Sequence, residues 1–137
     1  MQGQGVKGKN VEKEPRGFRT LNAWQKAYEL TLAVYRLSKR FPKEETYALT
    51  SQLQRAAVSV PANIAEGYER NHRKEYLQYL YIAKGSLGEV ETYLLLAKDL
   101  GYLPEKEFAA ISLIREETAR IIKGLIRALE EKKDSSK

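Results

Sequence analysis

One face of the predicted second helix carries a row of polar side chains whose types could bind a ligand or exchange a proton with it. The row consists of Gln52, Arg55, Ser59, Asn63 and Glu66. At 100° per residue these side chains fall within an arc of about 80°, and small apolar residues border the arc on both sides. Charged residues normally border a solvated face, so we expect the row to pack against other protein. There it either binds a ligand or fixes the register of helices and subunits, and we favour the second interpretation.

Buried polar groups need partners, because an unpaired one costs about 1–3 kcal/mol. The third predicted helix offers two acidic partners, Glu75 and Glu89, on one side of its main apolar stripe. We therefore predict a buried polar network that joins these carboxylates to the row on the second helix. Catalysis by Glu66, Glu75 or Glu89 would require an open cavity at this network, and we do not expect an enzyme.

Pro61 lies in the middle of the same helix. A proline there removes one backbone hydrogen bond and crowds the carbonyl of Ala57, so we predict a kink at this position. Ser59 or Asn63 is expected to satisfy the freed carbonyl.

A cationic sequence opens the third predicted helix, where the helix dipole favours acidic side chains. Residues 70–74 read RNHRK. An anion among these side chains would gain from their charges and from the free backbone N–H groups, and the phosphate backbone of nucleic acid is such an anion. The alternative is that Arg70 and Arg73 cap the negative end of the second helix across the short loop. The candidate nucleic-acid contacts are Arg70, Arg73, Lys74 and Lys84.

Two further motifs resemble a metal-binding pair and a phosphate-binding loop, and we interpret both as structural. Glu69 and His72 have the spacing of a metal-binding pair, but di-iron bundles need two such motifs, and the chain has one histidine and no cysteine. We therefore expect no metal site and no cofactor. The sequence GSLG at 85–88 lies in the middle of a predicted helix and lacks the lysine of a phosphate loop. Its small residues are expected to allow close helix approach.

Four amphipathic helices are predicted to position these groups, and no segment alternates like a strand. Their ranges are 22–40, 44–67, 72–100 and 104–132. We expect Asn22 and Asn71 as N-caps, Gly67 and Gly101 as left-handed C-caps, and Pro104 at the first helical position. Short connections make sequential helices antiparallel neighbours. The predicted fold is all-α, an antiparallel up-down-up-down four-helix bundle with a Pro-kinked second helix.

The bundle is expected to span residues 18–132. Segments 1–17 and 133–137 are predicted to be disordered tails, because they are charged and poor in large apolar side chains. The formal net charge is +6, and half of this excess lies in the tails, so composition favours polyanionic partners only mildly. No stretch reaches the roughly 20 apolar residues of a membrane span. We expect a cytoplasmic protein with no secretory signal and no membrane partner.

The segment LTSQLQRAAVSVPANIAEGYER, followed by KEYLQYLYIAKGSLGEVETYLLLAKDLGYL, closely resembles the four-helix-bundle proteins encoded in intervening sequences of bacterial 23S ribosomal RNA genes. FRTLNAWQKAYELTLAVYRLSKRFPKEE looks like the first helix of that family. The resemblance covers residues 18–103 in detail and the fourth helix more loosely. Lys84 stands where an arginine is common in the family, which keeps the charge.

The resemblance implies an antiparallel bundle that assembles as a ring-shaped homopentamer. The family is also similar to the basic bundle that accompanies reverse transcriptases in diversity-generating retroelements, which implies contact with nucleic acid and with a nucleic-acid-processing protein. No catalytic residues come with the resemblance. Apolar stripes on the first and third helices exceed what one small bundle buries, which also favours subunit contacts.

We therefore expect a non-enzymatic, homo-oligomeric bundle that binds RNA or ribonucleoprotein through basic surface and tail. The alternative is a protein-interaction scaffold without nucleic-acid binding. Salt distinguishes the two hypotheses, because phosphate binding fades as ionic strength rises.

Overall fold

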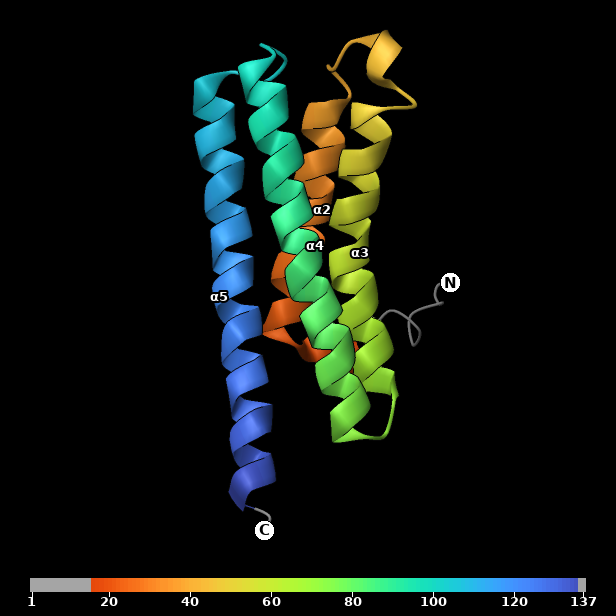
Figure 1. Cartoon of the computed structure of the whole chain (residues 1–137), viewed down its shortest axis with the longest axis vertical. Helices are drawn as coiled ribbons and strands as arrows, with labels where there is room; N and C mark the ends of the chain where they lie inside the picture. The colour runs from red at the N-terminus through yellow and green to blue at the C-terminus, as the bar shows by residue number, and fades with distance from the viewer. Residues whose placement is uncertain (1–15, 136–137) are drawn as a thin grey trace, which may run out of the picture.

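Four long helices lie side by side in the computed structural model, which describes residues 16–135, with side chains through residue 132. The elements in chain order are η1 (Gly17–Thr20), α2 (Asn22–Ser38), η2 (Lys43–Glu45), α3 (Leu49–Glu69), α4 (Arg73–Asp99) and α5 (Glu105–Ser135). The chain runs up through α2, down through α3, up through α4 and down through α5 (Figure 1). The described part of the chain contains no strand. It is an all-α four-helix bundle, as predicted.

The four helices form a closed square of neighbours. Helix α2 packs against α3 and α5, and α4 packs against the same two helices, while the diagonal pairs within residues 16–135 make no close backbone contact. Each helix therefore has two covered flanks and one outward face. Helix α4 separates the α3–α4 seam from the α4–α5 seam, which matters for the surfaces described below (Figure 1).

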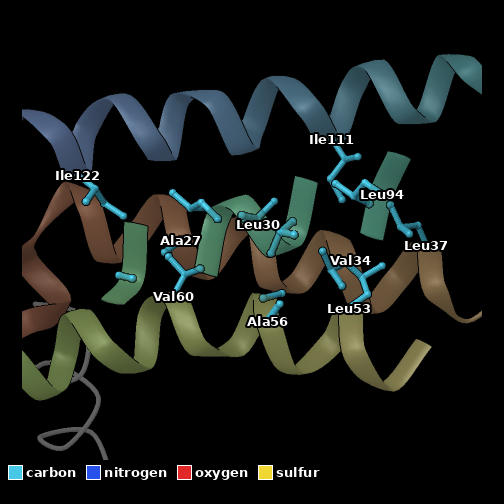
Figure 2. Close-up of a cluster of buried hydrophobic side chains, with 14 of the residues drawn as sticks. Ala27, Leu30, Val34, Leu37, Leu53, Ala56, Val60, Leu94, Ile111 and Ile122 are labelled. Atoms are coloured by element: carbon cyan, nitrogen blue, oxygen red, sulfur yellow. The ribbon is translucent and has the colours of Figure 1, made fainter. Parts of the chain in front are cut away.

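The core consists of apolar stripes along the four helices, because residues spaced three and four apart share one face of a helix. Figure 2 shows these side chains pointing between the helices. The largest fully buried side chains are Leu30, Val34, Leu53, Val60, Ile64, Leu80, Leu87, Val90, Leu94, Thr118 and Ile122. Thr118 lies among them because its hydroxyl donates to the carbonyl of Ile114 at 2.8 Å, which satisfies the buried oxygen.

The predicted end of α4 at Gly101 is confirmed. Gly101 has φ +84°, a left-handed conformation that a residue without a Cβ adopts freely. The N–H of Gly101 donates to the carbonyl of Lys98 at 3.0 Å, and the N–H of Tyr102 donates to that of Ala97 at 2.9 Å. This pair of bonds is the Schellman arrangement, which satisfies the last carbonyls of a helix.

Gly67 has a different role from the predicted one. It does not cap α3, which continues to Glu69, and its φ is not positive. A Cβ at this position would lie 2.8 Å from the Cβ of Tyr79 and 3.1 Å from Cδ1 of Tyr76. The prediction of a left-handed cap is therefore wrong, because the glycine is needed for the close approach of α3 to α4.

Several predicted helix starts are also corrected. The acidic pair Glu44–Glu45 belongs to the short helix η2, and α3 begins only at Leu49, whose N–H donates to Oε1 of Glu45 at 3.2 Å. The glutamate thus caps the next helix and does not sit in its first turn. The N-cap positions of α2 and α4 are Leu21 and His72 in place of the predicted asparagines, and neither makes a side-chain cap bond. Pro104 directly precedes α5.

The tail boundaries shift by a few residues. Gly17 belongs to η1, and α5 continues to Ser135, past the predicted end at residue 132. Residues 1–15 and 136–137 of the predicted tails lie outside the described residues.

The carbonyl freed by Pro61 is satisfied from a neighbouring helix. Oγ1 of Thr31 on α2 lies 3.0 Å from the carbonyl oxygen of Ala57 and 2.9 Å from that of Ala27, so its one proton is shared between these two acceptors. Asn63 instead donates to the carbonyl of Ser59 at 2.7 Å. The prediction that Ser59 or Asn63 serves this carbonyl is therefore wrong, and the bond from Thr31 ties α2 to α3 at the proline. The kink itself stays a prediction.

Candidate self-assembly and nucleic-acid interfaces

The middle of the polar row lies in the seam between α3 and α4. The hydroxyls of Ser59 and Ser86 are 2.8 Å apart, and Nδ2 of Asn63 donates to Oγ of Ser59 at 2.9 Å. Ser86 is buried, and Ser59 and Asn63 are half-buried. These three side chains form a small network that fixes the register of α3 against α4, as polar groups in a packed seam can.

The outer members of the row are open to solvent in the single chain. Gln52, Arg55, Glu66 and Glu89 are exposed, and Glu75 is half-buried. A single bundle therefore does not enclose these four residues, because the row is wider than the strip of α3 that α4 covers, and the predicted burial of the whole network by helices or subunits stays a prediction. Burial of these side chains would need a second copy or a partner.

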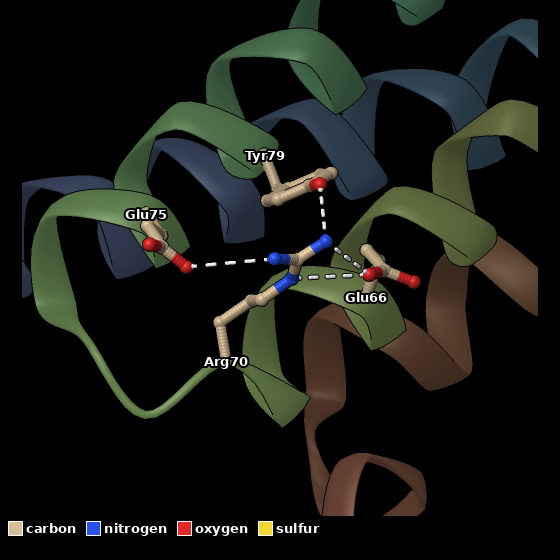
Figure 3. A network of polar contacts seen from close by, with 4 residues as sticks. All are labelled: Glu66, Arg70, Glu75 and Tyr79. Atoms are coloured by element: carbon tan, nitrogen blue, oxygen red, sulfur yellow. Dashed lines mark hydrogen bonds and ion pairs between the residues drawn. The ribbon is translucent and has the colours of Figure 1, made fainter.

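Arg70 lies at the lower end of the row and is held by three neighbours (Figure 3). It donates to Oε2 of Glu66 from Nη2 at 2.8 Å and from Nε at 3.1 Å. It also donates to the hydroxyl of Tyr79 at 3.0 Å, and its Nη1 lies 3.8 Å from Oε1 of Glu75. Hydrogen bonding to Glu66 raises the pKa of Arg70 above its ordinary value.

This geometry makes Arg70 less available to bind phosphate than the other predicted contacts. Its donors are used by Glu66 and Tyr79, and two carboxylates balance its charge. In the alternative interpretation Arg70 and Arg73 cap the negative end of the second helix. Arg70 instead pairs with the side chain of Glu66, one turn earlier on α3, and the capping role stays a prediction. Arg73, Lys74 and Lys84 remain as candidate contacts with nucleic acid.

A pocket of about 330 Å³ lies where the α3–α4 loop meets the far end of α5. It is lined by Arg70, Asn71, His72, Arg73, Tyr76, Leu129 and Lys132. Nε of Arg73 and the hydroxyl of Tyr76 are buried and have no hydrogen-bond partner among the described residues. Burial raises the pKa of Tyr76 to about 12, so its hydroxyl remains a donor at neutral pH. We call this the loop pocket.

The other two predicted cations lie on the outside of α4. Lys74 is exposed next to the loop pocket. Lys84 is eleven residues along α4 from Arg73 and lines a separate groove against α5. The four predicted contacts therefore do not form one patch, because Arg70 lies on the α3 side of α4 and Lys84 on the α5 side.

Two exposed apolar surfaces lie on different helices. The first is a groove of about 300 Å³ between α2 and α3, lined by Phe18, Trp24, Tyr28, Thr31, Val58, Pro61, Ala62 and Ala65. The rings of Trp24 and Tyr28 stack there, with centroids 4.8 Å apart. The second surface is the outer face of α4, where Ile82, Leu96 and Leu100 are 50, 45 and 50% exposed. We call these surfaces the α2–α3 groove and the α4 face.

The two glycines of the GSLG motif contribute to neither seam within the chain. A Cβ on Gly85 or Gly88 would meet nothing within 4 Å, and both residues are exposed. The prediction that they allow close helix approach is wrong for the single chain. Gly67 has that role instead.

The described residues contain neither a candidate metal-binding group nor a candidate membrane-spanning helix. Residues 16–132 hold no group of three or more His, Asp or Glu side chains placed to bind a metal ion. None of the helices between residues 16 and 135 is long and apolar enough to cross a bilayer.

Four long helices with a polar seam, two open apolar surfaces and scattered cations define a four-helix bundle. The sequence matches the family model of the 23S rRNA-intervening sequence protein over residues 19–124. This match covers most of the chain, and the protein belongs to that family.

One solved structure supports the fold independently. A Bacteroides thetaiotaomicron protein of unknown function from the S23 ribosomal protein family superposes with a TM-score of 0.71. Its sequence identity is 23%, and the alignment covers 76% of this chain and 97% of that chain. No curated protein sequence matches the chain. Fold and family membership are thus established, and the activity has to be argued from the surfaces.

Proposed function

We propose that this protein is a non-enzymatic assembly protein of the cytoplasm whose copies form a ring-shaped homopentamer, and that the ring binds RNA or ribonucleoprotein through its basic surface. A five-membered ring needs heterologous contacts, in which one patch of each copy meets a different patch of the next. The α2–α3 groove and the α4 face are two such patches on one chain. This pair of exposed apolar surfaces is the observation that carries the proposal.

The polar row gives such a contact its specificity. Its exposed members, Gln52 and Arg55 on α3 and Glu89 on α4, lie between the two apolar surfaces. A neighbouring copy seated over this region would remove them from water, so each would need a partner across the interface. Apolar burial would supply the affinity, and the polar groups would select the correct register.

Nucleic-acid binding is supported by the cations that remain without carboxylate partners. Arg73 and Lys84 make no ion pair with any residue whose side chain is described. The sequence pI is 9.4, which favours polyanions. In a ring, several weak phosphate sites act together, so the affinity of the assembly exceeds that of one copy.

Fluorescence anisotropy of a labelled single-stranded RNA tests this proposal when it is titrated at increasing salt. We expect binding that weakens steeply with salt, and a weaker affinity for the variant Arg73→Ala/Lys74→Ala. The matched variant Lys39→Ala/Lys43→Ala, which removes two exposed cations at the opposite end of the bundle, should bind RNA nearly as the wild type does. Absence of RNA binding at low salt would refute the nucleic-acid part of the proposal.

A protein-interaction scaffold is the second candidate, and the α2–α3 groove favours it. The groove is almost wholly apolar and includes a stacked aromatic pair, which is typical of the anchor region of a protein interface. Such a partner, for example a nucleic-acid-processing protein, would stay bound at a salt concentration that releases RNA. Co-purification at high and low salt separates the two functions.

A further inference from the structure

A second basic groove lies between α4 and α5, on the opposite flank of α4 from the polar row. It measures about 200 Å³ and is lined by Tyr81, Lys84, Lys123, Ile126, Arg127 and Glu130. We propose that this α4–α5 basic groove binds the phosphate backbone of a single nucleic-acid strand. The inference rests on the proposed RNA-binding function and names the site at which it would occur.

The charge of the groove is positive and available. Lys84, Lys123 and Arg127 make no ion pair with the residues whose side chains are described. The groove contains one carboxylate, Glu130, and it accepts a hydrogen bond from the hydroxyl of Tyr81. Three cations around one groove concentrate positive potential, so a bound phosphate gains from all three together.

The groove and the loop pocket are two separate cavities along the α4–α5 side, and together they have the length of a polymer site. Arg73 and Lys84 are eleven residues apart on α4, which places them about 20° apart around the helix and about 16 Å apart along it. Both therefore face the α5 side. Within a duplex, one strand carries a charge about every 3.4 Å of helix axis, and a free single strand is more extended, so this distance spans more than one phosphate in either case. A linear polyanion fits this arrangement better than one small anion does.

Tyr81 favours nucleic acid over other polyanions. Its ring is at the edge of the groove and 48% exposed, so it offers a flat surface beside the cations. Bases stack on such rings without regard to sequence, and an acidic protein or a polysaccharide has no base to offer. RNA and single-stranded DNA share the backbone chemistry recognised here.

Assembly would leave this groove open. Helix α4 packs against α3 on one flank and against α5 on the other. The polar row lies toward α3, and the basic groove is lined by α4 and α5. Helices α3 and α5 lie on opposite sides of α4 (Figure 1). A ring built through the α2–α3 groove and the α4 face thus presents one basic groove for each copy.

The test compares two triple variants that remove the same charge. Lys84→Gln/Lys123→Gln/Arg127→Gln neutralises the groove. Its control is a triple glutamine variant at the opposite end of the bundle, where all three lysines are exposed. The control variant is Lys39→Gln/Lys43→Gln/Lys106→Gln. Circular dichroism and light scattering confirm that both retain the fold and the oligomeric state of the wild type.

The probe is a fluorescein-labelled polyuridylate of about 20 nucleotides, titrated from about 50 to about 200 mM salt. We expect the groove variant to raise the Kd about tenfold and to reduce the slope of log affinity against log salt by about 2, since each contact with a single strand contributes about 0.7. The control should change the Kd by less than about twofold, because it retains every contact in the groove.

The outcomes separate this inference from the proposed function. If the wild type binds RNA and the groove variant binds it equally well with the same salt slope, the assignment of the RNA site to this groove is wrong, and the proposed function stands. If the wild type binds no RNA, both fall. Tyr81→Ala should weaken binding several-fold with an unchanged salt slope. Equal competition by polyglutamate would overturn the assignment to nucleic acid, and polythymidylate tests whether the ribose hydroxyl contributes.

Discussion

Replacing Gly67 with alanine is expected to destabilise the bundle, although this substitution normally favours a helix. The helical preference of alanine over glycine contributes about 1 kcal/mol of stability. The added Cβ would lie 2.8 Å from Cβ of Tyr79 and 3.3 Å from the carbonyl oxygen of Tyr76. Neither atom is the mobile end of a side chain, so α3 and α4 must separate.

The size of the effect follows from these two opposing contributions. Overpacking of a tight contact costs about 1–3 kcal/mol, and 2.8 Å against a Cβ belongs at the upper end of that range. After the helical gain, we expect a net loss of about 1–2 kcal/mol, or roughly 4–8 °C in Tm for a chain of this size.

Gly124→Ala is the matched control. Gly124 lies in α5, and a Cβ there would meet nothing within 4 Å, so the same substitution should raise stability by up to about 1 kcal/mol. Urea unfolding of the wild type and both variants, followed by circular dichroism at one protein concentration, gives the comparison. Similar stabilisation by both alanines would refute the close α3–α4 approach at Gly67.

Two further predictions concern the interior and the ion pairs. Thr31→Val should cost about 1–3 kcal/mol, because the carbonyl of Ala57 then loses its donor. The cost should shrink to below about 1 kcal/mol in a Pro61→Ala background, where the backbone N–H returns, and an unchanged cost in that double-mutant cycle would contradict the role of Thr31. Hydrogen bonding by Arg40 lowers the pKa of Glu107 below its ordinary value of 4.5. The charged form is therefore favoured in the folded state, and its stabilising effect is present above that value and lost as the pH falls through the lowered pKa. Acidification from about pH 6 to about pH 3 should lower the Tm of the wild type more than that of Glu107→Gln. Equal losses of Tm would show that the ion pair between Arg40 and Glu107 does not contribute to stability.

The sequence was sufficient for the helices and the core. The stripes on each predicted helix depend on helical spacing alone, and those of the first three helices are largely buried as expected. On α5 the predicted face is shifted, since Ile126 is buried and Ala128 is exposed. Gly101 was predicted correctly as a cap because it directly follows the last apolar residue of its helix. Gly67 also lies close to the end of a predicted helix and yet has another role, since what decides it is the approach of Tyr79 from α4.

Contacts between helices were the part that the sequence could not supply. Nothing local connects Thr31 to a proline thirty residues later, although a threonine on the core face of the first helix was a signal that a buried acceptor lies opposite. The polar row was correctly placed on one face, but small apolar neighbours do not show whether the same chain or another covers it. Lys123 and Arg127 were missed because α5 was examined for its apolar stripe alone.

Native mass spectrometry tests the central claim, self-assembly through the α2–α3 groove and the α4 face, most directly. We predict that the wild type has five times the 15.7 kDa mass of the chain, and that Ile82→Glu/Leu96→Glu, on the exposed face of α4, is a folded monomer. A monomeric wild type at micromolar concentration would contradict the account, and so would a pentamer that survives these two substitutions.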